Sequence, residues 1–104
     1  MLQVKSSKRA PARGALLPGR GETHQVFRNM EQVLLAGGSS LLDVVKVTVL
    51  LASMDDFGAV NEVYAKQFQH NLVLPARTTF AVLGLPKGAR VELDCVAVKS
   101  SAVS

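Results

Sequence analysis

The apolar residues of this 104-residue chain change their spacing along the sequence, and each change coincides with a turn signal. Between Thr23 and Gly37 they recur with helical periodicity, which predicts an amphipathic helix over about residues 23–36. Gly37 is a natural place for this helix to end. The apolar face of the helix would consist of Val26, Phe27, Met30, Val33 and Leu34.

The next two elements are a strand and a second helix. Residues 43–52, DVVKVTVLLA, are rich in β-branched side chains and predict a strand that is covered over most of its length. Asp55 or Asp56 can then cap a helix. The apolar stripe of that helix would consist of Phe57, Val60, Tyr64 and Phe68.

Two further strands complete the pattern. TTFAVLG, residues 78–84, predicts a strand parallel to residues 43–52, because a strand, a helix and a strand in succession favour a right-handed crossover. After the turn GLPKGAR, in which Gly88 is free to adopt a positive φ, RVELDCVAV alternates between apolar and polar residues. We expect residues 78–84 and 90–98 to form an antiparallel hairpin.

The order of these elements predicts an α+β sandwich with two helices on one face of a mixed sheet. Residues 1–21 show no usable periodicity and predict a basic, flexible segment, so that the domain would cover residues 22–104. Three strands are few to cover two helices of this length. Either the N-terminal segment supplies more sheet, or a partner subunit covers the remainder.

The net charge of +4 is unevenly distributed along the chain. Residues 1–28 contain six basic residues and one acidic residue, a balance of +5, whereas residues 29–104 contain six basic and seven acidic residues, a balance of −1. The basicity therefore belongs to the N-terminal segment, and nucleic-acid binding by the domain is not indicated. The first 20 residues, basic and without acids, weakly resemble an organelle transit peptide, although an irrelevant leader is the preferred interpretation.

The composition also limits the compartment. No segment approaches the roughly 18 to 20 consecutive apolar residues of a membrane span, which predicts a soluble protein without a membrane partner. Cys95 is the single cysteine, so an intrachain disulfide is impossible and a reducing compartment is favoured. We expect a cytoplasmic protein, with a mitochondrion or plastid as the alternative if the N-terminal segment is a transit peptide.

Most familiar catalytic and metal-binding patterns are missing from the sequence. His24 and His70 are far apart, and no H-x-x-x-H, C-x-x-C or phosphate-binding glycine motif occurs, so a zinc site has almost no support and a phosphate-binding loop is not indicated. Cys95 lies on the apolar side of its strand and is better interpreted as a core thiol than as a nucleophile.

Arg77 and Glu92 are the charged pair of most interest, because each lies in or beside an apolar strand. From the pattern alone, a salt bridge at the margin of the sheet is the favoured interpretation. The alternative is chemical: the arginine fork binds a carboxylate, and the glutamate holds and polarises a water. Such a pair suits hydrolysis of a small carboxylate-bearing molecule.

The blocks VVKVTVLLASMDDFGAVNEVYAKQF and LPARTTFAVLGLPKGARVELDCVAV resemble the Rid, or YjgF-type, family of reactive-intermediate deaminases, most closely its RidA branch. The resemblance covers about Glu22 to Val98. It implies a chorismate-mutase-like fold and a homotrimer with sites between subunits. It also implies hydrolysis of enamines and imines to 2-keto acids and ammonia, without metal or cofactor.

The resemblance also implies roles for individual residues. Arg77 of the PAR motif would hold the substrate carboxylate, and Glu92 of the last strand would position the attacking water. The backbone of Thr79 would lie beside the substrate, and Asn61 would line the site. Family members begin with strands carrying GPYSQA-like and SGQ-like segments, which contribute a tyrosine and a serine to the pocket, and neither segment occurs in this sequence.

Two other functions remain open from the sequence. The chain could be a trimer that keeps the carboxylate clamp but binds a metabolite or protein without turnover. A role directed at RNA ranks lower, because some relatives have been described as ribonucleases but this domain has a balance of −1 and few aromatic residues for stacking.

Overall fold

The computed structural model of the chain describes the backbone of residues 2–9 and 20–99. Within these residues, no helix is long and apolar enough to cross a membrane. The helices and strands are β1 (Leu2–Arg9), α1 (Arg20–Ala36), β2 (Val44–Leu51), α2 (Phe57–Gln67), β3 (Ala76–Ala81) and β4 (Ala89–Ala97). Three short 3-10 turns, η1 (Leu41–Asp43), η2 (Met54–Asp56) and η3 (Pro86–Gly88), lie between them.

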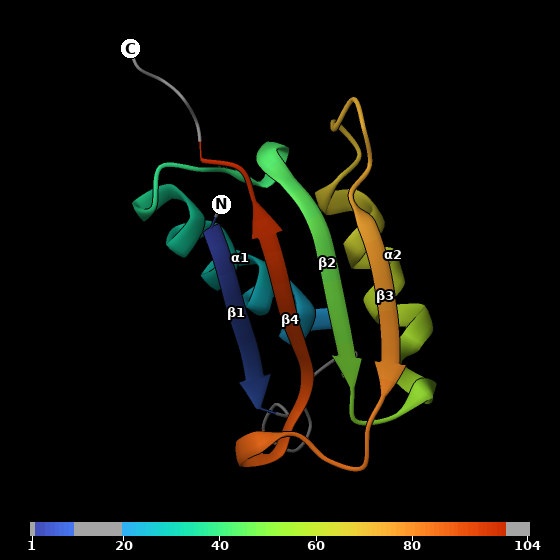
Figure 1. The fold of residues 1–104 in the computed structure, drawn as a ribbon. Helices are drawn as coiled ribbons and strands as arrows, with labels where there is room; N and C mark the ends of the chain where they lie inside the picture. Colours follow the sequence, from blue (N-terminus) through green and yellow to red (C-terminus); the bar gives the residue numbers. More distant parts are fainter. Residues whose placement is uncertain (1, 10–19, 100–104) are drawn as a thin grey trace.

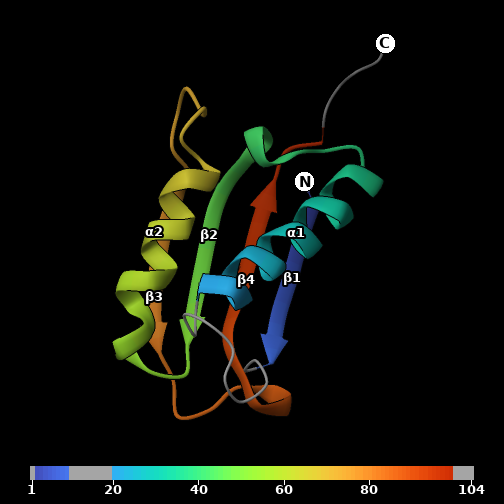
Figure 2. The same ribbon diagram turned by 180° about the vertical axis from the view of Figure 1, so that it is seen from behind.

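The four strands form one mixed sheet in the order β1-β4-β2-β3 (Figure 1). β2 and β3 are parallel, whereas β4 is antiparallel to both β1 and β2. Both helices lie on the same face of the sheet, with α1 over β1 and β4 and α2 beside β2 and β3 (Figure 2). The predicted α+β sandwich, with two helices on one face of a mixed sheet, is therefore confirmed.

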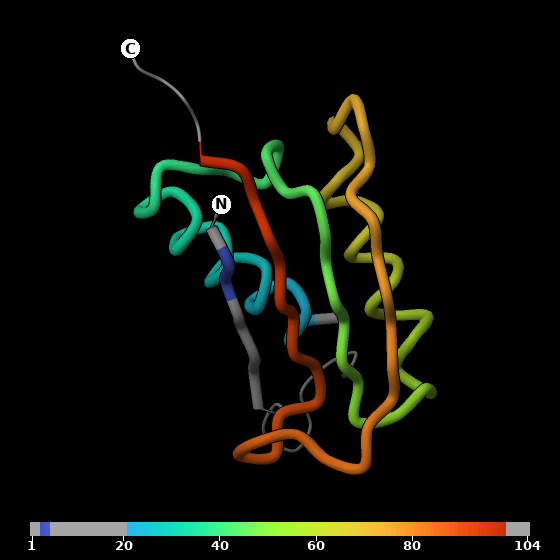
Figure 3. Tube along the Cα trace, in the orientation of Figure 1, coloured from blue at the N-terminus to red at the C-terminus, as the bar shows by residue number. Residues whose placement is uncertain are grey.

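The predicted hairpin between residues 78–84 and 90–98 is wrong, although each segment contains a strand. β3 pairs in parallel with β2, as the crossover argument predicted, and β4 pairs with the other edge of β2. The connection from β3 to β4 passes the end of β2 (Figure 3). The physical reason is burial: six of nine β4 residues are buried but none of the six β3 residues is, so β4 takes the central position.

The N-terminal segment supplies the fourth strand. Leu2–Arg9, which the sequence pattern assigned to a flexible segment, instead pair with β4 in an antiparallel ladder. Val4 of this strand contributes a buried side chain to the core. A strand at the edge of a sheet gains its order from backbone hydrogen bonds to its neighbour, which composition alone does not reveal. Residues 10–19 of the expected flexible segment lie outside the described residues.

The hydrophobic core lies between the sheet and the helices. β2 contributes Val47, Val49 and Leu51, which are paired with Cys95, Leu93 and Val91 of β4 and are fully or almost fully buried. The predicted stripe of α1 is confirmed at four of its five positions, whereas Val33 is 50% exposed at the margin of the stripe. The α2 stripe is also confirmed: three of its four predicted residues are buried and Phe57 is partly buried. Side chains alternate along each strand, so every second one points to the opposite face of the sheet, which neither α1 nor α2 covers.

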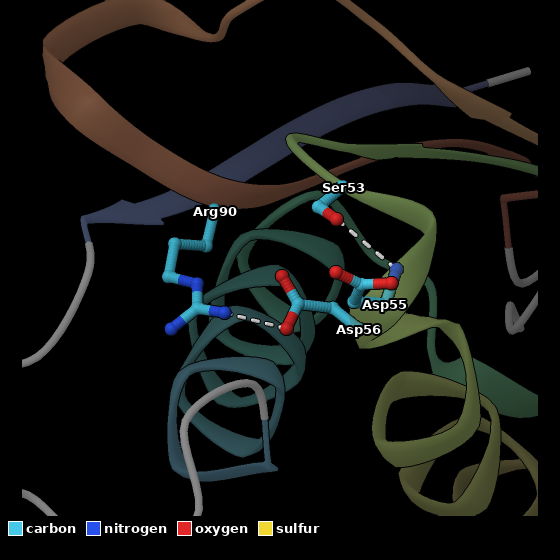
Figure 4. Close-up of polar contacts among 4 residues, drawn as sticks. All are labelled: Ser53, Asp55, Asp56 and Arg90. Atoms are coloured by element: carbon cyan, nitrogen blue, oxygen red, sulfur yellow. Dashed lines mark hydrogen bonds and ion pairs between the residues drawn. The ribbon is translucent and has the colours of Figure 1, made fainter.

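The ends of the helices follow their local sequence. α1 ends in a turn in which the N–H of Ser39 donates to the carbonyl of Leu34 at 2.8 Å, with Gly38 at a φ of +80°. Before α2, the hydroxyl of Ser53 accepts from the N–H of Asp55 (Figure 4). Asp56 stands at the N-cap position but makes no capping hydrogen bond with its side chain. The prediction that Asp55 or Asp56 caps the helix is therefore confirmed for the position of Asp56, although its carboxylate makes no capping hydrogen bond.

The carboxylate of Asp56 instead pairs with Arg90 at the start of β4. The guanidinium Nη2 donates to Asp56 Oδ1 at 2.6 Å (Figure 4). The Asp56 side chain is almost buried and that of Arg90 is about one-third exposed. This pair joins the start of α2 to the turn that brings the chain back into the centre of the sheet, so it supports the strand order.

We expect Arg90→Met to lower the free energy of unfolding by about 1–3 kcal/mol, because it leaves the nearly buried carboxylate of Asp56 without its cation. Urea denaturation followed by circular dichroism measures this change. Arg28→Met, the same substitution at an exposed position of α1, is the matched control and should change stability by less than about 0.5 kcal/mol. Equal effects of the two substitutions would contradict a stabilising role for the pair.

Candidate active site

Arg77 lies on the helix-covered side of β3. Its register partner on β2 is Val47, a fully buried residue of the core, and paired residues of neighbouring strands point to the same face. β3 is the edge strand next to α2, so the Arg77 side chain remains exposed while it contacts this helix. The cation therefore avoids the cost of full burial.

Two residues of α2 hold the Arg77 guanidinium. Nη1 donates a short hydrogen bond to Asn61 Oδ1. The guanidinium carbon Cζ also lies over the ring of Tyr64, 4.7 Å from its centroid, and 5.8 Å from the centroid of Phe57. Helical spacing explains the arrangement, because residues 57, 61 and 64 are separated by four and three positions and share one face of α2.

A pocket of about 530 Å³ opens beside Arg77. One wall comes from α2 and the residue that follows it, and the other from the segment that enters β3. The lining residues are Asn61, Tyr64, Ala65, Phe68, Gln69, Leu74, Pro75 and Arg77. Most of this lining is apolar, while the guanidinium supplies five N–H donors, one of which binds Asn61. The pocket is therefore suited to a small ligand with an anionic group and an apolar part.

The aromatic ring of Tyr64 lies against the guanidinium of Arg77. Its side chain is 9% exposed, and its hydroxyl is buried without a hydrogen-bond partner among the described residues. Burial raises the pKa of Tyr64, and the positive charge of Arg77 partly opposes that rise. The phenol thus stays neutral at physiological pH and presents the face of its ring to the guanidinium.

Glu92 lies on the other side of the sheet. Its neighbours along β4, Val91 and Leu93, are buried in the helix-side core, and alternation along the strand directs Glu92 to the face without helices. Its partners across the sheet are Leu50 of β2 and Ser7 of β1. The side chain is nevertheless only 6% exposed.

The structure therefore brings some of the expected site residues together and keeps one apart. Arg77 and Asn61 are in contact, and Thr79, paired with the buried Val49, lies on the same side of β3. Glu92 is separated from Arg77 by β2, roughly 10 Å across the sheet, and by the opposite direction of its side chain. The salt bridge between Arg77 and Glu92 at the margin of the sheet, favoured from the pattern alone, is therefore wrong within one chain.

Tyr64 was missed as a site residue from the sequence alone. The sequence pattern placed Tyr64 in the apolar stripe of α2. That prediction is confirmed, because its ring packs against Phe27 and Phe68 in the core. A signal was available: an arginine at the start of the next strand can meet only the face of α2 that covers that strand. The parallel crossover therefore pointed to this stripe as the partner of Arg77.

Other candidate chemistry finds little support in the described part of the chain. No group of three or more histidine, cysteine, aspartate or glutamate residues there could hold a metal ion. Cys95 is 1% exposed and packs in the core, as predicted. Its burial and the charge of Asp94 raise its pKa to about 11, so it is a poor nucleophile at neutral pH.

Comparison with known sequences gives a consistent result. The family described as Endoribonuclease L-PSP matches residues 9–99. A rat protein named 2-iminobutanoate/2-iminopropanoate deaminase is 46% identical over 91 residues, which are 86% of this chain and 65% of the rat protein. The human protein of the same name is 43% identical, with the same coverage. An Arabidopsis protein named Reactive Intermediate Deaminase A, chloroplastic, is 45% identical over 73% of this chain and 40% of its own length.

Solved structures agree with the sequence relatives. Yeast Mmf1 superposes with a TM-score of 0.79 at 33% identity and covers 94% of this chain and 80% of its own. Escherichia coli TdcF with bound serine superposes with a TM-score of 0.76 at 27% identity, over 94% of this chain and 81% of its own. The fold is thus shared, while this chain spans 65% of the length of the mammalian proteins.

We expect the thiol of Cys95 to react very slowly with iodoacetamide at pH 8, since it is buried and its pKa is about 11. The label should enter only when β4 separates from its neighbours, so that urea concentrations near the unfolding midpoint accelerate it. Mass spectrometry measures the labelled fraction. Labelling of the native protein as fast as that of free cysteine would contradict this prediction.

We expect Asn61→Asp to weaken binding of a small 2-keto acid such as pyruvate about tenfold, because the introduced carboxylate pairs with Arg77 and competes with the ligand. Isothermal titration calorimetry measures the affinity. Asn29→Asp is the matched control, because it makes the same change at an exposed position of α1. Unchanged affinity in Asn61→Asp would show that the carboxylate does not bind at Arg77.

Proposed function

The chain belongs to the Endoribonuclease L-PSP family, also known as the Rid or YjgF family, and we propose that it hydrolyses reactive imines and enamines to 2-keto acids and ammonia. The preferred substrates would be 2-iminopropanoate and 2-iminobutanoate, by similarity to the rat and human relatives. The alternative is a metabolite-binding or protein-interaction trimer without turnover. The chain spans 65% of the length of those relatives, so its own activity calls for a direct assay.

The observation that carries the proposal is the setting of Arg77. Its guanidinium contacts the amide of Asn61 and the ring of Tyr64 beside a pocket, and it remains exposed to solvent. A cation held in this way is suited to a carboxylate, which accepts two parallel hydrogen bonds from an arginine. The apolar lining from Ala65 and Phe68 can then contact the side chain of the imine.

The chemistry needs little beyond orientation and proton transfer. In the protonated imine the carbon of the C=N bond is electrophilic, and the oxygen of a water attacks it. Glu92 accepts a proton from that water. The proton then passes to the nitrogen of the resulting tetrahedral intermediate. As the C–N bond breaks and ammonia leaves, Glu92 accepts the proton of the hydroxyl group, and the C=O bond of the 2-keto acid forms. In this scheme Arg77 binds the carboxylate, and the backbone of Thr79 lies beside the substrate.

Glu92 and Arg77 lie on opposite sides of one sheet, so one chain alone does not bring them to one substrate. We infer that the site is completed between subunits of a homotrimer. In that arrangement the edge strand β3 of one subunit, which carries Arg77, faces the helix-free side of the next sheet, which carries Glu92. The helix-free face also carries Phe80, which is 54% exposed and would be covered by such contacts.

We expect Arg77→Ala and Glu92→Gln each to reduce the hydrolysis of freshly generated 2-iminopropanoate, by roughly 100- to 10,000-fold, because one removes the carboxylate clamp and the other the proton acceptor. The loss of the imine is followed by its absorbance or by trapping with semicarbazide. Wild-type protein that forms a trimer by light scattering but leaves the spontaneous rate unchanged would refute the deaminase and favour the binding alternative.

Mixing the two variants separates a site within one chain from a site between chains. Subunits of Arg77→Ala and Glu92→Gln are unfolded together and refolded as mixed trimers. If Arg77 and Glu92 come from different subunits, about a quarter of the sites in a random mixture contain both intact residues and regain activity. If both come from one chain, the mixture remains as inactive as either variant.

A further inference from the structure

We propose that Tyr64 is a positioning residue that fixes the Arg77 guanidinium through the face of its aromatic ring, and not through its hydroxyl. The proposal rests on the proposed function in one respect, namely that Arg77 binds the carboxylate of the substrate. It assigns a further residue to the site, and it predicts which chemical part of that residue matters.

The contact geometry supports an interaction with the ring. The Cζ atom of Arg77 is 4.7 Å from the centroid of Tyr64, within the range in which an arginine over an aromatic face is attracted by the ring electrons. Asn61, three positions earlier on α2, accepts from Nη1. One contact holds the face of the guanidinium plane and the other holds one N–H, so four of its five N–H donors remain for a ligand.

The ring is itself held rigidly by the core. Phe68 lies 4.8 Å from Tyr64 between ring centroids, and Phe27 of α1 approaches Tyr64 at 6.0 Å with the ring planes at 67°. These aromatic contacts link the pocket to α1 and limit movement of the Tyr64 ring. An exposed arginine without such a support samples many rotamers, and restricting them on binding reduces affinity. Prior fixation by Tyr64 therefore strengthens carboxylate binding.

The hydroxyl of Tyr64 plays no part in this arrangement. It is buried without a hydrogen-bond partner among the described residues, and the contact of Tyr64 with Arg77 is made by the ring. Phenylalanine has the same ring face and lacks only this group. Tyr64→Phe should therefore preserve the position of Arg77, whereas Tyr64→Leu should lose it while keeping an apolar residue in the stripe.

The first measurement detects the position of Arg77 directly. In a ¹H–¹⁵N spectrum, the Nε–H signal of Arg77 should be shifted upfield by the ring current of Tyr64. We expect the shift to persist in Tyr64→Phe and to decrease in Tyr64→Leu. This readout does not require enzymatic activity. An Arg77 signal that is the same in the wild type and in Tyr64→Leu would overturn the proposal.

The second measurement is the kinetics of 2-iminopropanoate hydrolysis. Tyr64→Leu should raise KM about two- to thirty-fold, the range expected for loss of a cation–π contact, with little change in kcat, because the carboxylate is bound equally in the ground state and the transition state. Tyr64→Phe should restore the wild-type KM. An increase in KM for Tyr64→Phe as large as that for Tyr64→Leu would assign the effect to the hydroxyl and overturn the proposal.

Phe27→Leu is the control for a general loss of packing. Phe27 contacts the same aromatic cluster from α1 and does not line the pocket. It should reduce stability, as Tyr64→Leu does, but raise KM less than Tyr64→Leu, because the ring of Tyr64 that contacts Arg77 is kept. An equal rise in KM would overturn the proposal. If the wild type has no activity but the spectra of the two Tyr64 variants follow the predicted pattern, the positioning of Arg77 is supported and the proposed function fails.

Discussion

Burial of one apolar row shared by β2 and β4 determines the arrangement of the other elements. Val47, Val49 and Leu51 lie beside Cys95, Leu93 and Val91, and both helices cover this double row. Because the two most apolar strands must be neighbours under the helices, β3 is left at the edge and pairs with the free side of β2. The edge position is what allows Arg77 to remain solvated while it contacts α2, so the candidate site depends on the packing of the core.

The two faces of the sheet carry different residues of the candidate site. The helix side carries Arg77 with its contacts to Asn61 and Tyr64, and the opposite side carries the almost buried Glu92. A sheet is only one layer thick, and neighbouring side chains of a strand point to opposite faces, so no local rearrangement of β4 can transfer Glu92 to the side of Arg77. Assembly of subunits is the physical route by which we propose that both residues reach one substrate, and it also covers apolar surface that a chain of this size leaves exposed.

The charged residues of the described region illustrate how local context decides the use of a similar group. Arg90 meets the carboxylate of Asp56 and joins two elements, whereas Arg77 meets an amide and an aromatic ring and keeps most of its donors available. An arginine already paired with a carboxylate has little capacity for an anionic ligand. The contacts of Arg77 orient the cation without neutralising it, as the proposed binding of a carboxylate requires.

The sequence by itself determined the elements from α1 onward, the parallel direction of β2 and β3, the core thiol of Cys95 and the family to which the chain belongs. These features follow from local periodicity, from the right-handed crossover and from motifs that are contiguous in the chain. Only the tertiary structure decided that β4 lies between β1 and β2, that β1 exists, and that Tyr64 supports Arg77 while Glu92 faces away. Strand order and edge pairing depend on which of several distant segments occupy the same buried positions and backbone hydrogen bonds. The sequence pattern of one segment gives no information about the other segments that compete with it.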